Sequence, residues 1–206
     1  MLDGIGKTFG TRRVLADISD TIRGGECVAV VGANGSGKST LLKIVAGLLR
    51  PSRGTVSARF GGRVITDAGE RRGLVGYCAP DLTFYAELSG AENLRFFVEA
   101  GGGVVSAGEI GARLDAVGLS GRGADRVSVY SSGMRQRLRL AFAVGGGDVP
   151  ILLLDEPSLA LDSGGVELAR EIIRCQKERG GITLLATNDT REIAWSDRCI
   201  GVEARP

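Results

Sequence analysis

Short apolar runs and amphipathic stretches alternate along this chain, with glycines between them. Two continuous apolar runs, at residues 27–31 and 151–154, predict strands that are buried on both faces, as they are in a parallel sheet, and the mainly apolar run at 182–186 predicts a third strand. Longer stretches with helical periodicity lie between the runs. This order predicts an α/β fold.

Three stretches carry apolar side chains at helical spacing. Residues 38–49 form the first, which Pro51 would end, residues 164–179 form the second, with Gly180 at its end, and residues 134–143 form the third. The residues expected to face inward are Leu41, Leu42, Ile44, Val45 and Leu48 in the first helix, and Val166, Ala169, Ile172 and Ile173 in the second. Each helix should therefore pack one apolar face against the rest of the fold.

The middle of the chain, about residues 84–144, is predicted to be a helical insertion. A Ser-x-x-Glu capping box at residues 89–92 precedes a helical stretch at 93–99, and another at 106–109 precedes residues 110–117. In such a box the serine and the glutamate satisfy each other's backbone N–H groups, so each box marks the start of a helix.

Two runs of three glycines, at residues 101–103 and 145–147, are predicted to be loops. Three adjacent glycines would lose too much backbone entropy inside a helix or strand. We find no internal repeat.

Composition limits the classes of protein to consider. The 206 residues, 43% hydrophobic and 24% charged, suit one domain spanning residues 1–206. The net charge of +2 comes from 26 basic and 24 acidic residues spread along the chain, so no basic stripe points to nucleic acid. The chain has no histidine and its four cysteines form no close pair, which excludes a Cys/His metal cluster and favours reduced cytosolic thiols. No apolar run approaches the roughly 20 residues of a membrane span, and no secretion signal is recognised, so we expect a cytoplasmic protein that reaches a membrane only through a partner.

The strongest motif is a complete phosphate-binding loop at residues 32–39, Gly-Ala-Asn-Gly-Ser-Gly-Lys-Ser, between a predicted strand and a predicted helix. Its glycines allow consecutive backbone N–H groups to surround an anion, and the following helix adds the positive end of its dipole. Lys38 supplies a full charge, and Ser39 a hydroxyl for Mg²⁺. The residues expected to bind ATP here are Gly32, Asn34, Gly35, Ser36, Gly37, Lys38, Ser39 and Thr40.

A second motif agrees with the first. The apolar run at 151–154 ends in Asp155 and Glu156, at the edge of an open α/β sheet where ligands bind. Asp155 is a candidate Mg²⁺ ligand, and Glu156 is the candidate base for a water aimed at the γ-phosphate. Alone, an Asp-Glu pair after an apolar run often marks only the solvent-exposed end of a strand. Together with the phosphate loop, the pair predicts ATP hydrolysis.

Residues 130–137, Tyr-Ser-Ser-Gly-Met-Arg-Gln-Arg, resemble the Leu-Ser-Gly-Gly-Gln-x-Gln-Arg signature of ABC (ATP-binding cassette) transporter nucleotide-binding subunits, and the resemblance covers nearly the whole chain. By itself the segment is an ordinary serine N-cap. The resemblance implies a RecA-like P-loop NTPase core, an N-terminal antiparallel β subdomain and an inserted helical subdomain. It also implies a head-to-tail dimer, homomeric or heteromeric, in which Ser131, Ser132 and Gly133 of one subunit contact the ATP held by the other.

The resemblance assigns two more positions. Phe9 stands where an aromatic ring stacks on adenine, although a lone Phe would more often belong to a core. Asp162 stands where the family joins its two protomers, and its simpler interpretation is a helix cap.

Two positions depart from the family pattern. Asp81 stands where the family has a glutamine that touches Mg²⁺ and the attacking water, and we expect it to engage the metal together with Ser39 and Asp155. Asn188 stands where the family has a switch histidine; it can donate a hydrogen bond but carries no charge. We therefore expect an active ATPase, with Glu156, Lys38 and Asn188 as catalytic residues, that turns over slowly.

The transported substrate is not encoded in a subunit of this kind. The short chain and the Tyr-Ser-Ser-Gly-Met signature resemble the small ATPases of haem export in cytochrome c maturation, and also suit other small exporters. Aromatic and apolar residues between 84 and 97 are the expected contact for an integral membrane subunit, or else they fill the core of the helical subdomain: Phe84, Tyr85, Leu88, Phe96 and Phe97. The alternatives are a soluble ABC ATPase without a transport role, and a nucleotide-binding regulatory subunit with weak hydrolysis.

Overall fold

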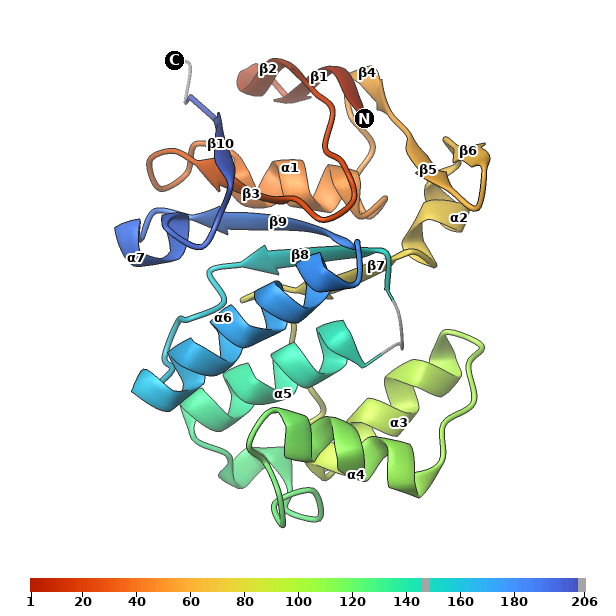
Figure 1. Cartoon of the computed structure of the whole chain (residues 1–206), viewed down its shortest axis with the longest axis vertical. Helices are drawn as coiled ribbons and strands as arrows, with labels where there is room; N and C mark the ends of the chain where they lie inside the picture. Colours follow the sequence, from red (N-terminus) through yellow and green to blue (C-terminus); the bar gives the residue numbers. More distant parts are fainter. Residues whose placement is uncertain (146–148, 204–206) are drawn as a thin grey trace.

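A parallel sheet of five strands forms the centre of the computed structural model, which describes residues 1–145 and 149–203 (Figure 1). The strand order is β10-β3-β9-β8-β7. The strands are β3 (Cys27–Val31), β7 (Val75–Cys78), β8 (Ile151–Asp155), β9 (Ile182–Thr187) and β10 (Arg198–Gly201). The three predicted strands are confirmed and occupy the three middle positions. The edge strands β7 and β10 have no continuous apolar run: alternate residues are buried in β7, and Ile200 is the one buried residue of β10.

A separate antiparallel sheet in the order β2-β1-β4 lies at the top of Figure 1 and confirms the predicted β subdomain. Its strands are β1 (Leu2–Phe9), β2 (Arg12–Asp20) and β4 (Arg53–Val56). The chain continues into the hairpin of β5 (Ala58–Phe60) and β6 (Arg63–Ile65), and then into the short helix α2 (Ala68–Arg72).

Helix α1 (Lys38–Val45) lies between the two sheets (Figure 1). Its Leu41, Leu42, Ile44 and Val45 are buried, in one apolar cluster with residues of β1, β2, β8 and β9. The predicted extension to residue 49 is wrong. Gly47 ends the helix in a left-handed conformation (φ +75°), and a Cβ there would stand 2.6 Å from the Ala68 carbonyl oxygen. Leu48 is consequently 59% exposed rather than inward.

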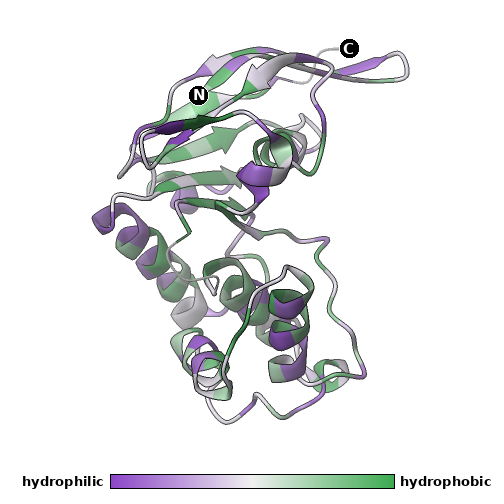
Figure 2. Cartoon of the chain, turned by 90° about the vertical axis from the view of Figure 1, so that its right-hand side faces the viewer, coloured by the Kyte–Doolittle hydropathy of each residue, from purple (hydrophilic) through white to green (hydrophobic). Residues whose placement is uncertain are grey.

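The opposite face of the sheet is covered by α5 (Ser132–Val144) and α6 (Ser163–Glu178), as Figure 1 shows. Both helices are confirmed, with ends one to two residues from those predicted. Ala169 and Ile173 are buried, whereas Val166 and Ile172 are half-buried. The short helix α7 (Thr190–Ile193) follows β9. In Figure 2, hydrophobic residues concentrate in the central strands and along one side of each helix.

Between β7 and β8 the chain forms α3 (Gly90–Ala100), α4 (Ala107–Ala116), the 3-10 turn η1 (Val127–Val129) and α5. Both capping boxes are confirmed: the Ser89 and Ser106 side chains accept the backbone N–H of Glu92 and Glu109, at 3.2 Å in each case. Residues 101–103 form the predicted loop. Of the second glycine run, residues 146 and 147 lie outside the described residues.

All four cysteines are free thiols, and Cys27 and Cys78 are buried. In the part of the chain that the structure describes, no helix combines the length and the apolar character needed to cross a bilayer.

Candidate nucleotide site

The predicted site residues lie in loops that follow neighbouring strands. The phosphate loop follows β3, Asn188 follows β9, Glu156 follows β8, and Asp81 lies in the loop after β7. These four strands are consecutive in the parallel sheet, so their carboxyl ends meet at one edge. Residues from four distant parts of the sequence are brought together there.

The phosphate loop leads directly into α1, whose N-cap residue is Gly37. No side chain caps this helix, so its first backbone N–H groups face the loop without a side-chain acceptor. Gly37 has a φ of +110°, and a Cβ would stand 2.7 Å from Val14 Cγ1. Gly35 has a φ of +76° with nothing within 4 Å of its Cβ position, so the loop has open space on that side. Both features fit an anion held by backbone N–H groups.

Lys38 is only 6% exposed. Its Nζ donates to the carbonyl oxygens of Gly32 (2.8 Å) and Ala33 (3.2 Å), within the loop. Beside it, the buried Ser36 Oγ has no hydrogen-bond partner among the described residues. A buried ammonium group that donates its hydrogen bonds to loop carbonyls, and a buried hydroxyl without a partner, fit a loop shaped for a phosphate.

A cavity of about 550 Å³ opens in front of this loop. Its volume is in the range of small-molecule sites. Its lining contains Phe9, Arg12, Val14, Asn34, Gly35, Gly37, Lys38, Ser39, Thr40 and Glu156. Phe9 is 49% exposed, and Lys7 Nζ lies 4.9 Å from its ring centroid, so the ring is a surface platform rather than a core residue. Sequence reasoning missed Arg12 and Val14, because no motif marks the β1–β2 hairpin as part of the site.

Asp155 ends β8 and is only 3% exposed. Burial raises its pKa, the Ser39 side chain that hydrogen-bonds to it lowers it, and the nearby charges of Glu156 and Asp81 raise it further. A cation at Asp155 would relieve this electrostatic cost. Within residues 1–145 and 149–203, no group of three or more His, Cys, Asp or Glu is placed to hold a metal alone. Asp155 and Ser39 are the residues here that could hold Mg²⁺, because Mg²⁺ is commonly bound by one or two protein groups together with phosphates and water.

Glu156 lines the cavity in an unusual backbone conformation, with a φ of +49°. Its backbone N–H donates to the Ala186 carbonyl oxygen at the end of β9 (2.9 Å). A non-glycine residue in the left-handed region is strained, and such strain is typical of functional positions.

Asp81 bonds to a different partner from the one we predicted. Its Oδ2 accepts a hydrogen bond from Lys43 Nζ on α1 at 2.6 Å. It is still close enough to Asp155 to raise the pKa of that carboxyl, so its role as a metal ligand stays a prediction.

Asn188 lies against the phosphate loop. Its Nδ2 donates to Asn34 Oδ1 at 2.8 Å. The position where the family has its switch histidine is therefore linked to the loop by a neutral hydrogen bond.

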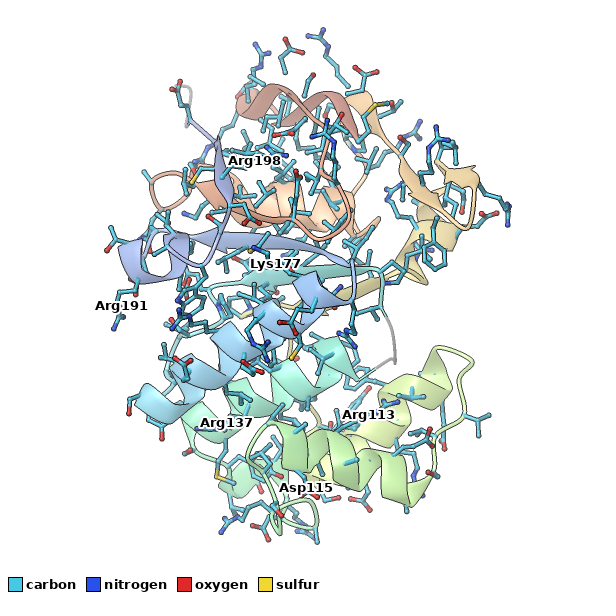
Figure 3. The ribbon with its side chains drawn as sticks, in the orientation of Figure 1. Arg113, Asp115, Arg137, Lys177, Arg191 and Arg198 are labelled. Carbon is cyan, nitrogen blue, oxygen red and sulfur yellow. The ribbon has the colours of Figure 1, made fainter. Side chains whose placement is uncertain are left out.

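The signature residues 131–133 lie at the start of α5, away from the cavity at the phosphate loop. Ser131 caps α5 by accepting the Met134 backbone N–H at 3.2 Å, and both Ser131 and Ser132 are exposed. None of residues 131–133 lines the cavity at this chain's own phosphate loop. Asp162 caps α6 through the Gly165 N–H (2.8 Å) and pairs with Arg137 of α5 at 2.7 Å (Figure 3).

Glu192, on α7, is a further residue that sequence reasoning missed. It is 2% exposed, its Oε1 accepts the Ser158 backbone N–H at 2.9 Å, and its Oε2 has no partner among the described residues. It anchors the segment that follows Asp155 and Glu156. The only feature of the sequence that could have pointed to Glu192 was its position four residues after Asn188.

A family model described as "ABC transporter" matches residues 15–159 of the chain, which include the phosphate loop, the signature and both carboxylates. The chain belongs to this family. This ABC subunit has the fold of ABC ATPase cassettes.

Relatives of known name differ in what their names say about transport. The ABC subunit is 34% identical to the uncharacterized ABC transporter ATP-binding protein YdbJ of Bacillus subtilis, over 93% of this chain and 62% of that protein. It is 36% identical to the cytochrome c biogenesis ATP-binding export protein CcmA of Rhizobium johnstonii, over 87% of this chain and 83% of that protein. It is also 36% identical to the aliphatic sulfonates import ATP-binding protein SsuB 2 of Pseudomonas aeruginosa, over 98% of this chain and 71% of that protein. Export and import subunits are thus about equally similar to it.

A solved dimeric bacterial ABC transporter cassette superposes with a TM-score of 0.83 at 25% identity, covering 100% of this chain and 98% of that chain. The likeness extends over the whole ABC subunit.

Proposed function

We propose that this ABC subunit binds and hydrolyses ATP with Mg²⁺ and powers a transporter whose membrane-spanning part is a separate protein. The observation that carries the proposal is the meeting, at one sheet edge, of the uncapped phosphate loop and the strained Glu156, beside the buried Asp155. Residues 32–40 and Phe9 would bind ATP, with Phe9 under the adenine. Mg²⁺ would be held by Asp155 and Ser39, where it would polarise the phosphate oxygens.

In the proposed reaction, Glu156 accepts a proton from the attacking water, and Lys38 stabilises the charge that develops on the phosphate. Asn188 donates a neutral hydrogen bond near the γ-phosphate. Because Asn188 carries no charge and Asp81 adds a negative one, we propose that turnover is slower than it would be with the family residues at these positions.

We propose that the second half of the site comes from another ATP-binding subunit. Ser131 and Ser132 are exposed, and neither they nor Gly133 line the cavity of their own chain, which supports a contribution to the ATP of a partner subunit. A head-to-tail arrangement of two copies, or of this chain and a related one, would bring them there.

We propose that the membrane partner contacts exposed aromatic residues near α3. Tyr85 is 50% and Phe96 42% exposed, and their ring centroids lie 5.0 Å apart. Phe97 is half-buried and its ring packs against those of Phe84 and Phe142, whereas Tyr85 and Phe96 are open to a partner. This contact would hold the ABC subunit at the inner face of a membrane.

For the transported substrate, we propose export in cytochrome c biogenesis. The support is the chain's identity of 36%, 35% and 37% to three CcmA proteins. Similarity to import subunits such as SsuB 2 supports the alternative, an importer.

The proposal can be tested in the organism that carries the gene. Deleting it should abolish haem-stained c-type cytochromes, and wild-type protein, but not Glu156→Gln, should restore them. Normal cytochromes in the deletion strain, together with loss of growth on an imported nutrient such as an alkanesulfonate, would favour the importer.

A further inference from the structure

The loop after β7 is held at two adjacent residues by two different elements. Asp81 Oδ2 accepts from Lys43 Nζ of α1 at 2.6 Å, and the carbonyl oxygen of Leu82 accepts from Arg139 Nε of α5 at 2.9 Å. Helix α1 begins at the phosphate loop, and α5 begins at the signature. Residues 79–83, here called the strap, therefore connect the two helices that start at the two halves of the proposed composite site.

The contacts continue from the strap to the segment after Glu156. Arg139 Nη1 donates to Gln136 Oε1 at 3.1 Å, and Gln136 is only 2% exposed. Gln136 Nε2 donates to the carbonyl oxygen of Pro157 at 2.9 Å. Since Pro157 directly follows Glu156, the contacts from Lys43 to Pro157 join α1, the strap, α5 and the candidate base.

The negative charge of Asp81 calls for a counterion, because Asp81 lies near the sheet edge where nucleotide phosphates would bind. Asp155 and Glu156 already bring two carboxylates to the same sheet edge, and Asp81 contributes to the raised pKa of Asp155. An unneutralised third carboxylate would repel the phosphates of a nucleotide. Lys43 supplies the compensating charge from α1.

The Lys43–Asp81 pair contributes little to overall stability, because its side chains are 36% and 65% exposed. Its position is the informative feature: Lys43 lies on the helix of the phosphate loop, five residues after Lys38. The pair therefore fixes where the strap lies rather than whether the chain folds.

We propose that Lys43 is a positioning residue that neutralises Asp81 and holds the strap against α1, so that α5 and the segment after Glu156 are aligned with the phosphate loop. The role of Lys43 in positioning the strap depends only on contacts within the chain and does not require ATP. The part that concerns ATP rests on the proposed function.

The positional part is tested by hydrogen exchange of residues 79–83 in the nucleotide-free protein. Lys43→Met should speed exchange there by about two- to fivefold, the range that an exposed ion pair supports. Asp81→Asn should do the same, the double variant should be no faster than either single one, and Lys43→Arg should behave as the parent. Unchanged exchange in Lys43→Met, or additive effects of the two substitutions, would overturn the inference.

The chain offers a matched control. Lys177 and Asp197 form an ion pair of the same length, 2.6 Å, with side chains 31% and 44% exposed (Figure 3). Asp197 also accepts the Cys27 N–H at the start of β3, the end of that strand away from the phosphate loop. Lys177→Met should leave exchange in the strap unchanged; faster exchange there would show a general effect of removing a lysine.

The charge part is tested by ATP binding without added metal. Lys43→Met should weaken ATP binding by about two- to tenfold at low salt and less at high salt, because an uncompensated Asp81 repels the phosphates. In the Asp81→Asn background the same substitution should have no effect. An equal loss in both backgrounds would overturn the charge role of Asp81. Failure of the parent protein to bind ATP would contradict the proposed function instead, while the exchange data would still decide the positional part.

Discussion

Two helix N-termini, those of α1 and α5, have the same proposed ligand but differ in construction. Helix α1 starts at Gly37 with no side-chain cap, beside a lysine that is only 6% exposed. Helix α5 has Ser131 as its N-cap, whose own side chain accepts the Met134 N–H, and Ser131 and Ser132 are exposed. No side chain accepts the first N–H groups of α1, whereas the Ser131 side chain accepts an N–H group of α5. The difference supports a site that is built in one chain and completed by exposed residues of another.

The largest expected effect comes from removing the candidate base while the N-termini of α1 and α5 are left unchanged. Glu156→Gln should lower ATP turnover by roughly 10²- to 10⁴-fold, the usual contribution of a general base, with ATP binding retained. Turnover measured together with nucleotide affinity checks this. Turnover at the parent rate would mean that Glu156 is not the base.

The second test separates the two helix ends. Ser132→Asp adds a negative charge to the exposed first turn of α5, which favours the helix dipole but repels a phosphate. The monomer should keep its stability or gain about 0.3–1 kcal/mol. ATP-dependent dimerisation should weaken by roughly tenfold or more, equivalent to at least about 1.4 kcal/mol.

A matched control for this substitution lies in α4. Ala107→Asp puts the same charge at the first residue of another exposed helix that a serine caps. It should affect stability similarly and leave ATP-dependent dimerisation unchanged. If Ser132→Asp dimerised like the parent, the α5 end would not bind nucleotide.

The sequence predicted these two helix N-termini because each is marked by residues that are adjacent in the sequence. The phosphate loop needed only its glycines, lysine and serine, and the α5 cap needed only a serine before a helix. The three central strands were predicted because continuous or mainly apolar runs mark burial on both faces. The edge strands β7 and β10 were missed because few of their residues are buried, alternate ones in β7 and only Ile200 in β10.

Contacts between distant residues were not predictable in the same way. No motif in the sequence marks Lys43, and its pairing with Asp81 depends on the packing of α1 beside the loop after β7. The same holds for Arg12 in the cavity wall and for Glu192 under the Ser158 N–H. The end of α1 was misplaced because Gly47 adopts a left-handed conformation, while the prediction relied on Pro51.

A third test measures the electrostatic cost at the α1 end. Burial and the charges of Glu156 and Asp81 raise the pKa of Asp155, so its ionised form opposes folding at neutral pH. Asp155→Asn should therefore stabilise the nucleotide-free protein by roughly 0.5–2 kcal/mol, as measured by urea unfolding.

The pH dependence of this gain has a definite sign. Below the pKa of Asp155 in the unfolded chain, both states are protonated and the variant should have no advantage. The advantage should develop as pH rises and be complete above the raised pKa of the folded state. A variant less stable than the parent at neutral pH would show that the Ser39 hydrogen bond outweighs burial.

The smallest expected effect concerns the neutral contact of Asn188 with Asn34. Asn188→His would allow an imidazolium to donate a charge-assisted hydrogen bond, which is roughly twice as strong as a neutral one. Turnover should rise by about two- to fivefold, and only as pH falls toward about 6.5, where histidine becomes protonated. The pH profile of the variant divided by that of the parent checks this, because changes common to both cancel. A ratio of one at every pH would show that the missing charge at residue 188 does not limit turnover, which would leave the added negative charge of Asp81 as the proposed cause of slow turnover.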